Sequence, residues 1–350
     1  GDKVDVDFGD LLDFFAVDRG TRSILLYVES VKEARKFMSA ARAAARAKPV
    51  VVIKAGRHAQ SAKAAATHTG ALAGSDAVYA AAFRRAGLLR AYDLDELFDA
   101  AETLGALRPF PGDRLAIITN GGGVGVLAVD RLVDFGGKLA EVSPETLARL
   151  DAELPKTWSR ANPIDIIGDA DEERYATALE ALIDDPANDA ILVLNVPTTL
   201  GSPPAIAKKV AEVTVAARNK RFPAKPVLAS WIGEDEAIAA TFNAAGIPHY
   251  PTDVEAVRGF MHLVRYTDAQ ARLMETPPSL PADFSPDVAE ARLAVDAAIA
   301  DRRQWLDPVE ATRVCQAYEI PIAATVPARD AEEAAKAAAP ILAEGQRVTV

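Results

Sequence analysis

Short apolar runs alternate with alanine-rich stretches of helical periodicity along most of this chain. Residues 23–28 form a first apolar run, residues 31–47 have the spacing of an amphipathic helix, and residues 49–54 form a second apolar run. Parallel strands need a crossover between them, and this order of strand, helix and strand supplies a helical one. The sequence therefore predicts an α/β fold built on open parallel sheets.

The same alternation returns after Pro109 and Pro111, which interrupt the chain. A strand is expected over residues 115–119, and strands and helices then alternate up to residue 250. We therefore expect one domain over residues 1–110 and a second over residues 111–270. The later strands of this second domain are expected at residues 190–195, 226–231 and 246–250.

The last part of the chain has a different pattern. Prolines cluster between residues 276 and 286 and precede an amphipathic helix, so residues 271–306 are expected to form a linker and a helix. A helix and then a strand over residues 322–326 are expected to open a further domain over residues 307–350. The chain starts with Gly1 and ends in an apparent strand start, so we expect a fragment.

Composition excludes several classes of protein. The 350 residues include 50 acidic and 39 basic side chains, which gives a net charge of −11, and no long basic run is present to follow a nucleic acid backbone. Cys315, the single cysteine, cannot form an internal disulfide. No apolar stretch approaches the roughly 20 residues that span a bilayer. We expect a cytoplasmic protein with no nucleic acid or membrane partner.

His68 lies in a stretch of small residues between the apolar run that ends at Lys54 and a helix expected to begin near Asp76. A neutral imidazole, with a pKa near about 6.5, is a competent nucleophile at neutral pH. Gly70 and Gly74 would give such a loop conformational freedom and act as its hinges. The alternative is an ordinary solvated loop histidine, and the spacing alone does not decide between the two.

The other histidines, His58, His249 and His262, do not have metal-ligand spacing, so no metal site is expected.

A glycine-rich turn, Asn120 to Gly125, follows the strand expected at residues 115–119 and opens a helix. Backbone N–H groups of Gly121, Gly122 and Gly123 at a helix N-terminus can approach an anion such as phosphate. The dinucleotide-binding pattern requires glycine at the position of Val126, so this turn departs from it. The alternative is a tight turn that allows close packing.

Gly168, Asp169 and Ala170 precede a second expected helix, which begins with acidic residues. This helix N-terminus can also hold a phosphate, and ordinary capping explains its acidic residues equally well. Glu29 ends the first expected strand, at the edge where ligands bind in parallel sheets, and it can orient an imidazole. The alternative for Glu29 is a solvated residue at a strand end.

Three segments together resemble the NDP-forming acyl-CoA synthetases, a family that includes ADP-forming acetate–CoA ligase and the related succinyl-CoA synthetase. They are residues 24–29, the strand end at residues 51–57, and residues 61–76 with their His-Thr-Gly-Ala-Leu-Ala-Gly core. The resemblance implies that His68 is transiently phosphorylated and that Glu29 steadies it. The turn from Asn120 to Gly125 lies in a matching place, and the resemblance also implies that the helix N-terminus at Gly168, Asp169 and Ala170 helps to hold the phosphorylated histidine.

The resemblance further implies a fold and a reaction. The fold is α/β, with two successive flavodoxin-like open parallel-sheet ligase domains followed by the start of an ATP-grasp domain. The reaction makes acyl-CoA from a carboxylic acid, CoA and ATP through a phosphohistidine and an acyl phosphate. ATP or ADP, Mg²⁺ and CoA are expected in the intact enzyme, with most of their binding sites outside this chain, which is expected to be inactive alone.

Partners and one alternative function also follow from the resemblance. The chain is expected to act as a homodimer or with the remaining domains of the same enzyme. The alternative function is an acyl-CoA-sensing, ligase-like region of a protein lysine acetyltransferase.

Overall fold

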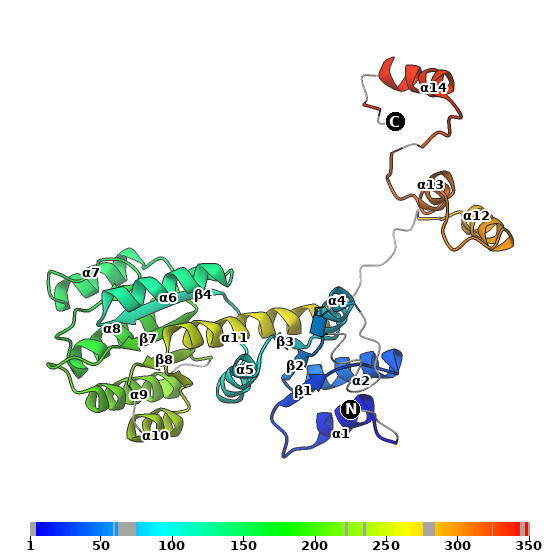
Figure 1. The fold of residues 1–350 in the computed structure, drawn as a ribbon. Coiled ribbons are helices and arrows are strands. Elements are labelled where there is room, and N and C mark those ends of the chain that lie inside the picture. The colour runs from blue at the N-terminus through cyan, green and yellow to red at the C-terminus, as the bar shows by residue number, and fades with distance from the viewer. Residues whose placement is uncertain are drawn as a thin grey trace. The chain divides into compact units, whose positions relative to one another are not determined.

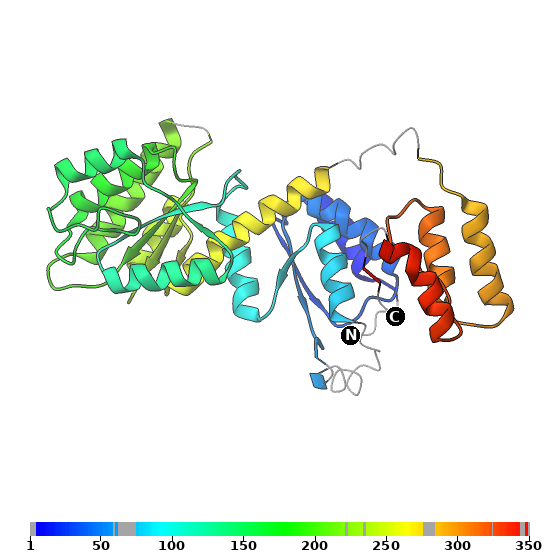
Figure 2. The same cartoon turned by 90° about the horizontal axis from the view of Figure 1, so that it is seen from above.

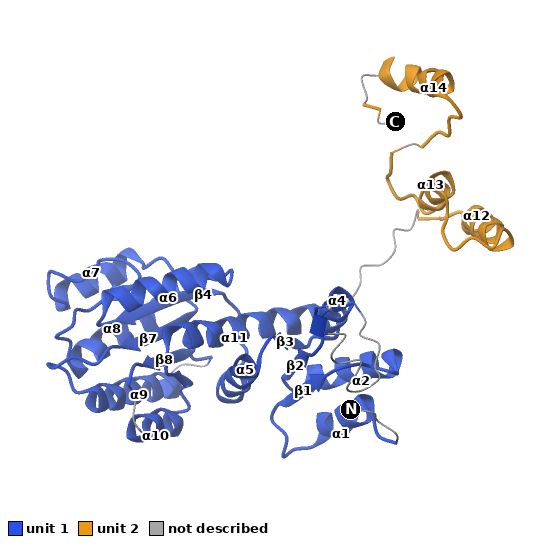
Figure 3. Ribbon diagram, in the orientation of Figure 1, with its two compact units in different colours: residues 1–275 blue, residues 276–350 orange. Residues whose placement is uncertain are grey.

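The computed structural model divides the chain into two compact units, residues Gly1–Glu275 and Thr276–Val350 (Figure 3). Within them, the structure describes residues 5–58, 60–61, 75–220, 223–233, 236–275, 284–323, 325–343 and 347–348.

The first sheet of the larger unit has three parallel strands in the order β1-β2-β3 (Figure 1). All five residues of β2 are buried because this strand is central and helices cover the sheet. The register pairs Val28 with Lys54 and Ile53 with Ala91, so the carboxyl ends of the three strands lie side by side. The strands are β1 (Ile24–Val28), β2 (Val50–Lys54) and β3 (Leu89–Ala91).

Four helices accompany this sheet, and their sequences explain their ends. Asp7 caps the first helix by accepting from the backbone N–H of Gly9 and Asp10, and Gly87 ends the third in the left-handed conformation that glycine favours. The core on one face includes alanines of the second helix, which pack with residues of β1 and β2. The helices are α1 (Phe8–Val17), α2 (Ala34–Ala47), α4 (Asp76–Ala86) and α5 (Leu94–Ala106).

The second sheet is also parallel, with the order β5-β4-β7-β8-β9. The strand β6 pairs with the end of β4, whose start pairs with β5, so two very short strands share one side of β4. The sequence did not predict these two-residue strands. The members are β4 (Arg114–Thr119), β5 (Lys138–Leu139), β6 (Ile164–Asp165), β7 (Ala190–Asn195), β8 (Val227–Trp231) and β9 (His249–Tyr250).

Helices pack on both faces of this sheet (Figure 2). On one face, Trp231 of the sheet packs with Tyr175 and Phe242 of the covering helices α7 to α10. On the other face, Leu115 and Leu192 lie under α6 and α11. The helices are α6 (Gly122–Asp134), α7 (Pro144–Glu153), α8 (Glu172–Asp184), α9 (Pro203–Lys220), α10 (Glu236–Ala245) and α11 (Asp253–Met274).

A single apolar core joins the two sheets. It contains Ile53 and Leu89 of the first sheet, Ile117 of the second, Leu104 of α5 and Phe260 of α11. Because α5 and α11 pack on both sheets, the carboxyl edge of each sheet is held in one compact unit.

The smaller unit contains α12 (Val288–Ala300), α13 (Pro308–Ala317) and α14 (Ala331–Ala343). The prediction of a strand over residues 322–326 is wrong, because the residues described in this range are not in a strand. A strand needs a partner and apolar cover, whereas Ile322 and Val326 are 39% and 55% exposed and the described part of this unit holds no strand to pair with.

Candidate functional site

The carboxyl edge of the first sheet brings charged side chains together at the ends of three strands. Glu29 directly follows β1 and is half-buried, Lys54 ends β2, and Arg90 lies within β3. In open parallel sheets ligands bind at this edge, because helix N-termini and loops converge there.

Lys54 is a buried cation at this edge, only 2% exposed. Its ammonium donates a hydrogen bond to the carbonyl of Ala55 and lies 4.7 Å from the centre of the Tyr79 ring. Burial away from water lowers the pKa of Lys54, and the negative charges of Asp76 and Glu29 act against that shift. Lys54 is therefore held between the first sheet and α4.

The first residue of α4 is bound to the same edge. Asp76 pairs with Arg90 of β3 at 2.5 Å, and the Tyr79 hydroxyl accepts a hydrogen bond of 3.2 Å from the backbone N–H of Val31. The Arg90 guanidinium also lies 5.0 Å from the centre of the Tyr92 ring. The ion pair of Asp76 and the hydrogen bond to Tyr79 together fix the N-terminal turn of α4 near the strand ends.

The histidine proposed from the sequence and its two hinge glycines, His68, Gly70 and Gly74, lie outside the described residues. The segment that contains His68 runs between β2 and α4 in the sequence. Lys54 is the last residue of β2, and Asp76 is the first residue of α4.

The carboxyl edge of the second sheet is organised by Asn120, which is 5% exposed. Its Nδ2 donates to the carbonyl of Val196 at 2.8 Å, and its Oδ1 accepts from the N–H of Val196 at 2.8 Å. The Thr119 hydroxyl also accepts from the N–H of Gly121 at 3.0 Å. These bonds fix the turn between β4 and α6 against the end of β7.

The glycines of this turn serve different purposes. A Cβ atom on Gly121 would lie 2.7 Å from a methyl of Val196, and one on Gly122 would lie 2.5 Å from Asp165 Oδ2. Close packing therefore requires these two glycines, as the packing alternative expected. A Cβ atom on Gly123 would meet nothing within 4 Å, so the first turn of α6 is open above this residue.

The N-terminus of α6 has no capping side chain of its own, and the Asp165 carboxylate lies beside Gly122 in its first turn. Its N-cap is Gly121, which makes no side-chain capping bond, and its first turn contains no acidic residue. The partial positive charge at this helix end is therefore not offset by a carboxylate of the helix itself.

The structure brings the segment Gly168–Ala170 next to this turn. The N–H of Ile166 donates to the carbonyl of Thr119 at 2.8 Å, and a Cβ atom on Gly168 would lie 3.7 Å from the carbonyl oxygen of Asn120. Ile167 has a φ of 71°, a left-handed conformation that is unusual for a β-branched residue. The two segments that the sequence singled out in this domain thus lie together at one sheet edge.

The N-terminus of α8 differs from that of α6 in the charge of its own first turn. Asp171 caps α8, whose first turn carries Glu172 and Glu173. A hydrogen bond from Arg174 lowers the pKa of the Asp169 carboxyl, so Asp169 is ionised at neutral pH. The N–H of Ala170 is already bonded to the carbonyl of Ile167 at 3.0 Å. Acidic side chains of α8 itself thus surround its start, whereas the carboxylate beside the start of α6, that of Asp165, comes from β6.

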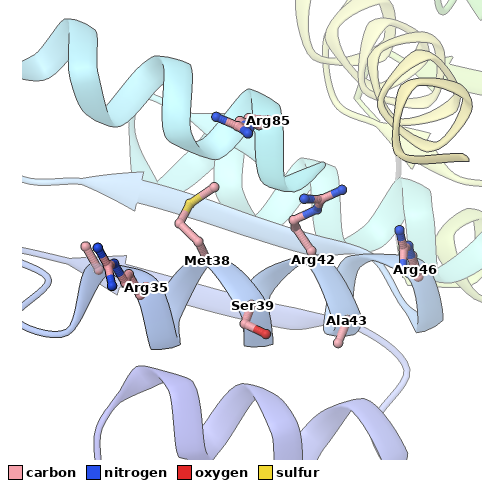
Figure 4. Close-up of a pocket in the computed structure, with 8 residues that line it drawn as sticks. Arg35, Met38, Ser39, Arg42, Ala43, Arg46 and Arg85 are labelled. Carbon is pink, nitrogen blue, oxygen red and sulfur yellow. The ribbon is translucent and has the colours of Figure 1, made fainter. Parts of the chain in front are cut away.

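A concavity of about 930 Å³ lies on the outer face of α2, beside α4 (Figure 4). Arg35, Arg42, Arg46 and Arg85 contribute guanidinium groups to it, and Met38 points between α2 and α4. This basic concavity is not lined by any residue that the sequence singled out.

Among the residues that the structure describes, no three His, Cys, Asp or Glu side chains are grouped so as to hold a metal ion. In the same part of the chain, no helix is long and apolar enough to cross a membrane.

Three family models match successive parts of the chain. They describe a succinyl-CoA ligase like flavodoxin domain at residues 1–104, a ligase-CoA domain at residues 115–274 and an ATP-grasp domain at residues 297–348. The alpha subunit of ADP-forming acetate–CoA ligase I from Pyrococcus furiosus is 40% identical over 277 residues, which cover 79% of this chain and 59% of that subunit. The chain belongs to the NDP-forming acyl-CoA synthetase family. The predicted fold, two flavodoxin-like ligase domains followed by the start of an ATP-grasp domain, is confirmed.

Other members of this family are similar over different lengths. ADP-forming 4-hydroxybutyrate–CoA ligase from Nitrosopumilus maritimus is 31% identical over 97% of this chain and 47% of its own length. A solved structure of acetyl-coenzyme A synthetase 1 from Ca. Korarchaeum cryptofilum, in complex with phosphate and ADP, matches with a TM-score of 0.71 and 34% identity. That match covers 79% of this chain and 59% of the other. The chain thus spans about half of the length of these relatives.

Sequence reasoning gave no role to four residues of the first edge: Lys54, Asp76, Tyr79 and Arg90. One signal was present, because Lys54 is the charged residue in a strand whose other four residues are Val or Ile. The partners of Lys54 come from a helix and a strand further along the chain, so only the fold brings them together.

Proposed function

We propose that this chain is the ligase part of an enzyme that joins a small carboxylic acid to CoA while ATP is cleaved to ADP and phosphate. The observation that carries the proposal is the succession of the three matched domain types, with a His-Thr-Gly segment between β2 and α4. The relatives named above are ligases or synthetases of this kind, which favours ligation over the acyl-CoA-sensing alternative.

The proposed reaction has three balanced steps. A ring nitrogen of His68 attacks the γ-phosphorus of ATP, the bond to the bridging oxygen breaks, and ADP leaves. The substrate carboxylate then takes the phosphoryl group, which gives an acyl phosphate and restores the imidazole. The sulfur of CoA attacks the acyl carbon, phosphate leaves, and the thiol proton goes to solvent or phosphate. A phosphorylated histidine suits the middle position because it is a reactive phosphoryl donor.

Glu29 is the proposed catalytic partner of His68. A carboxylate that accepts a hydrogen bond from one imidazole nitrogen orients the other nitrogen for attack. The position of Glu29 at the carboxyl edge of the first sheet, beside the strand from which the His68 segment departs, supports this role.

The proposed phosphate-holding groups lie at the second edge. The start of α6, where a Cβ atom on Gly123 would meet nothing within 4 Å, supports roles for the backbone of Gly121, Gly122 and Gly123. The adjacent backbone of Gly168, Asp169 and Ala170 is a weaker part of the proposal because of the acidic side chains around it. Gly70 and Gly74 are the proposed hinges of the His68 segment.

The domain division that we propose is residues 1–110, 111–270, 271–306 and 307–350. The separate sheets on either side of residue 110 support its first boundary. The enzyme would use ATP or ADP, CoA and Mg²⁺, and would work as a homodimer or with the remaining domains of the same enzyme. The phrase "subunit alpha" in the name of one relative supports such an assembly.

Radiolabelling of the complete enzyme tests the proposed function. Wild-type protein is incubated with γ-labelled ATP and Mg²⁺ beside a His68→Ala variant, and the label is tested for lability in acid and stability in alkali. His58→Ala is the matched control, because His58 is an exposed histidine between β2 and α4. We expect label in the wild type and in the control and none in His68→Ala. Folded wild-type enzyme that takes up no label would refute the proposal.

A further inference from the structure

Four arginines gather at one concavity of an acidic chain. The basic concavity of about 930 Å³ is lined by Arg35, Arg42 and Arg46 of α2 and by Arg85 of α4. The described residues that line it include no acid, although the chain as a whole carries a net charge of −11. Positive charge is thus concentrated here against the overall charge of the protein.

The guanidinium groups of this concavity have few partners of their own. Arg35, Arg42 and Arg85 are exposed, and none of them makes a hydrogen bond or an ion pair within the described ranges. Arg46 makes one long hydrogen bond, of 3.5 Å, to the carbonyl of Leu273. Most of the N–H donors of the four groups therefore remain available for a ligand.

Arginines with a structural role look different in this protein. Arg114 donates to both carboxylate oxygens of Asp189, at 2.9 and 2.7 Å. Arg258 donates to the carboxylate of Asp99 at 3.0 Å. The acid that lies nearest to the concavity in the sequence, Glu33, is exposed and does not line it. The four arginines of the concavity are thus not explained by internal ion pairs.

The positions of the arginines indicate how long the ligand is. Arg35 lies in the first turn of α2 and Arg46 in the last, so their Cα atoms are about 16 Å apart along the helix axis. Between them, Arg42 extends from α2 toward α4, and Arg85 extends from the facing part of α4 (Figure 4). A single phosphate or carboxylate cannot reach both ends, so an anion with several charges along its length fits better.

Guanidinium groups favour phosphate among such anions. The planar fork of arginine can donate two parallel N–H bonds to one phosphate group. A chain of three phosphates carries about four negative charges at neutral pH, one for each arginine. Half-buried Met38 adds a polarizable thioether on which an aromatic base can lie. The volume also falls within the range of small-molecule sites, about 300–1,000 Å³.

A protein partner fits this concavity less well. The binding energy of a protein interface comes mainly from large side chains in well-packed pockets near its centre. Apart from the arginines, the described lining residues are Met38, Ser39, Ala34 and Ala43, which provide one large apolar side chain among them.

We propose that the basic concavity is a binding site for a nucleoside triphosphate, with the phosphates on the arginines and the base against Met38. No bond of the nucleotide forms or breaks there. The inference goes beyond the proposed function, because none of the lining residues has a part in the proposed reaction, and it adds a nucleotide site to the one that this reaction uses.

The test counts the nucleotides that the complete enzyme binds. Equilibrium dialysis with the β,γ-imido analogue of ATP, which resists transfer of its terminal phosphate, gives the number of sites and their Kd values. We expect the wild type to bind one nucleotide more per chain than the double variant Arg42→Gln/Arg85→Gln. Each single variant should weaken binding at the additional site by about 10-fold, because it loses a charge-assisted hydrogen bond.

Arg84→Gln is the matched control. Arg84 is the neighbour of Arg85 on α4, is also exposed, and lines a different concavity. The control removes the same charge and should leave the number of sites and both affinities unchanged. All variants should melt near the wild-type temperature without nucleotide, since the replaced arginines have exposed side chains, so that a lost site is not a loss of folding.

Two results would overturn the inference. Equal numbers of bound nucleotides in the wild type and in the folded double variant would show that the arginines hold no nucleotide. Inorganic tripolyphosphate that binds at this site as tightly as the ATP analogue would show that the site does not recognise a nucleoside. Neither result depends on whether His68 is labelled, so this inference and the proposed function fail separately.

Discussion

Asn120 and Val196 exchange two hydrogen bonds of 2.8 Å, through both polar atoms of the Asn120 side chain and both polar groups of the Val196 backbone. The exchange joins the end of β4 to the end of β7, two neighbouring strands of the second sheet. It imitates one further step of the sheet ladder at a point where the chain turns into α6, so the amide fixes the position of the glycine turn.

Replacing Asn120 by alanine should therefore destabilise the protein. The N–H and carbonyl of half-buried Val196 would lose their partners, and an unsatisfied group costs up to about 1–3 kcal/mol when it is buried. Chemical denaturation of the Asn120→Ala and Asn120→Asp variants beside the wild type measures this loss in the free energy of unfolding. The aspartate keeps the acceptor for the Val196 N–H and loses the donor, so its loss of stability should be the smaller. Equal stability of wild type and Asn120→Ala would show that the exchange contributes nothing.

Alanine substitutions at two adjacent glycines should have opposite effects on stability. A Cβ atom at position 122 would lie 2.5 Å from Asp165 Oδ2, whereas one at position 123 has nothing within 4 Å. We expect Gly122→Ala to destabilise the protein and Gly123→Ala to stabilise it by roughly 0.5–1 kcal/mol, since alanine loses less backbone entropy in a helix.

The Gly123→Ala variant also tests whether phosphate approaches the N-terminus of α6, as proposed above. If the space above Gly123 is where the phosphoryl group passes, Gly123→Ala should transfer phosphate to the carboxylic acid more slowly in spite of its higher stability. A Gly123→Ala enzyme with unchanged transfer would place the phosphate elsewhere.

Much of the fold could be predicted because apolar periodicity is a local property. The expected strands at residues 190–195 and 226–231 correspond to β7 and β8, which are buried on both faces and have continuous apolar runs. The two-residue strands β5 and β6 were missed because so short a segment has no periodicity. The strand expected at residues 322–326 had the right composition and lacked a partner within the described residues of its unit.

The candidate sites could be predicted only in part, for a physical reason. Glycines in a turn and a carboxylate at a strand end are visible in the sequence, so Glu29 and Gly121 could be named as candidates. The cluster of Lys54, Asp76 and Arg90 depends on parallel register and on where α4 starts, which no single segment specifies. The same limit applies to Asn120, whose partner Val196 is 76 residues away.

The pair His262 and Glu96 lies in the core that joins the two sheets, on α11 and α5. His262 is fully buried, its Nε2 lies 4.0 Å from Glu96 Oε1, and neither ring nitrogen has a hydrogen-bond partner within the described ranges. Burial, with smaller contributions from Arg265 and Arg258, lowers the pKa of His262 to about 3. Burial raises the pKa of Glu96, so this carboxyl keeps its proton to a higher pH than usual.

The buried imidazole should make the protein less stable in weak acid. Below its ordinary pKa of 6.5 the unfolded state binds a proton that folded His262 takes up only near pH 3. The free energy of unfolding should thus fall by up to about 1.4 kcal/mol per pH unit through this window. Glu96 acts in the opposite direction, because its raised pKa favours the folded state until the pH rises through that value.

Replacing His262 by leucine isolates the contribution of the imidazole. We expect His262→Leu to lose less stability than the wild type between pH 6.5 and pH 5, because leucine has no proton to bind in the unfolded state. Urea unfolding at several pH values measures the difference, and the exposed His58→Gln variant is the control that should follow the wild type. Parallel curves for wild type and His262→Leu would mean that His262 can be protonated in the folded protein, so water must then reach the core between the two sheets.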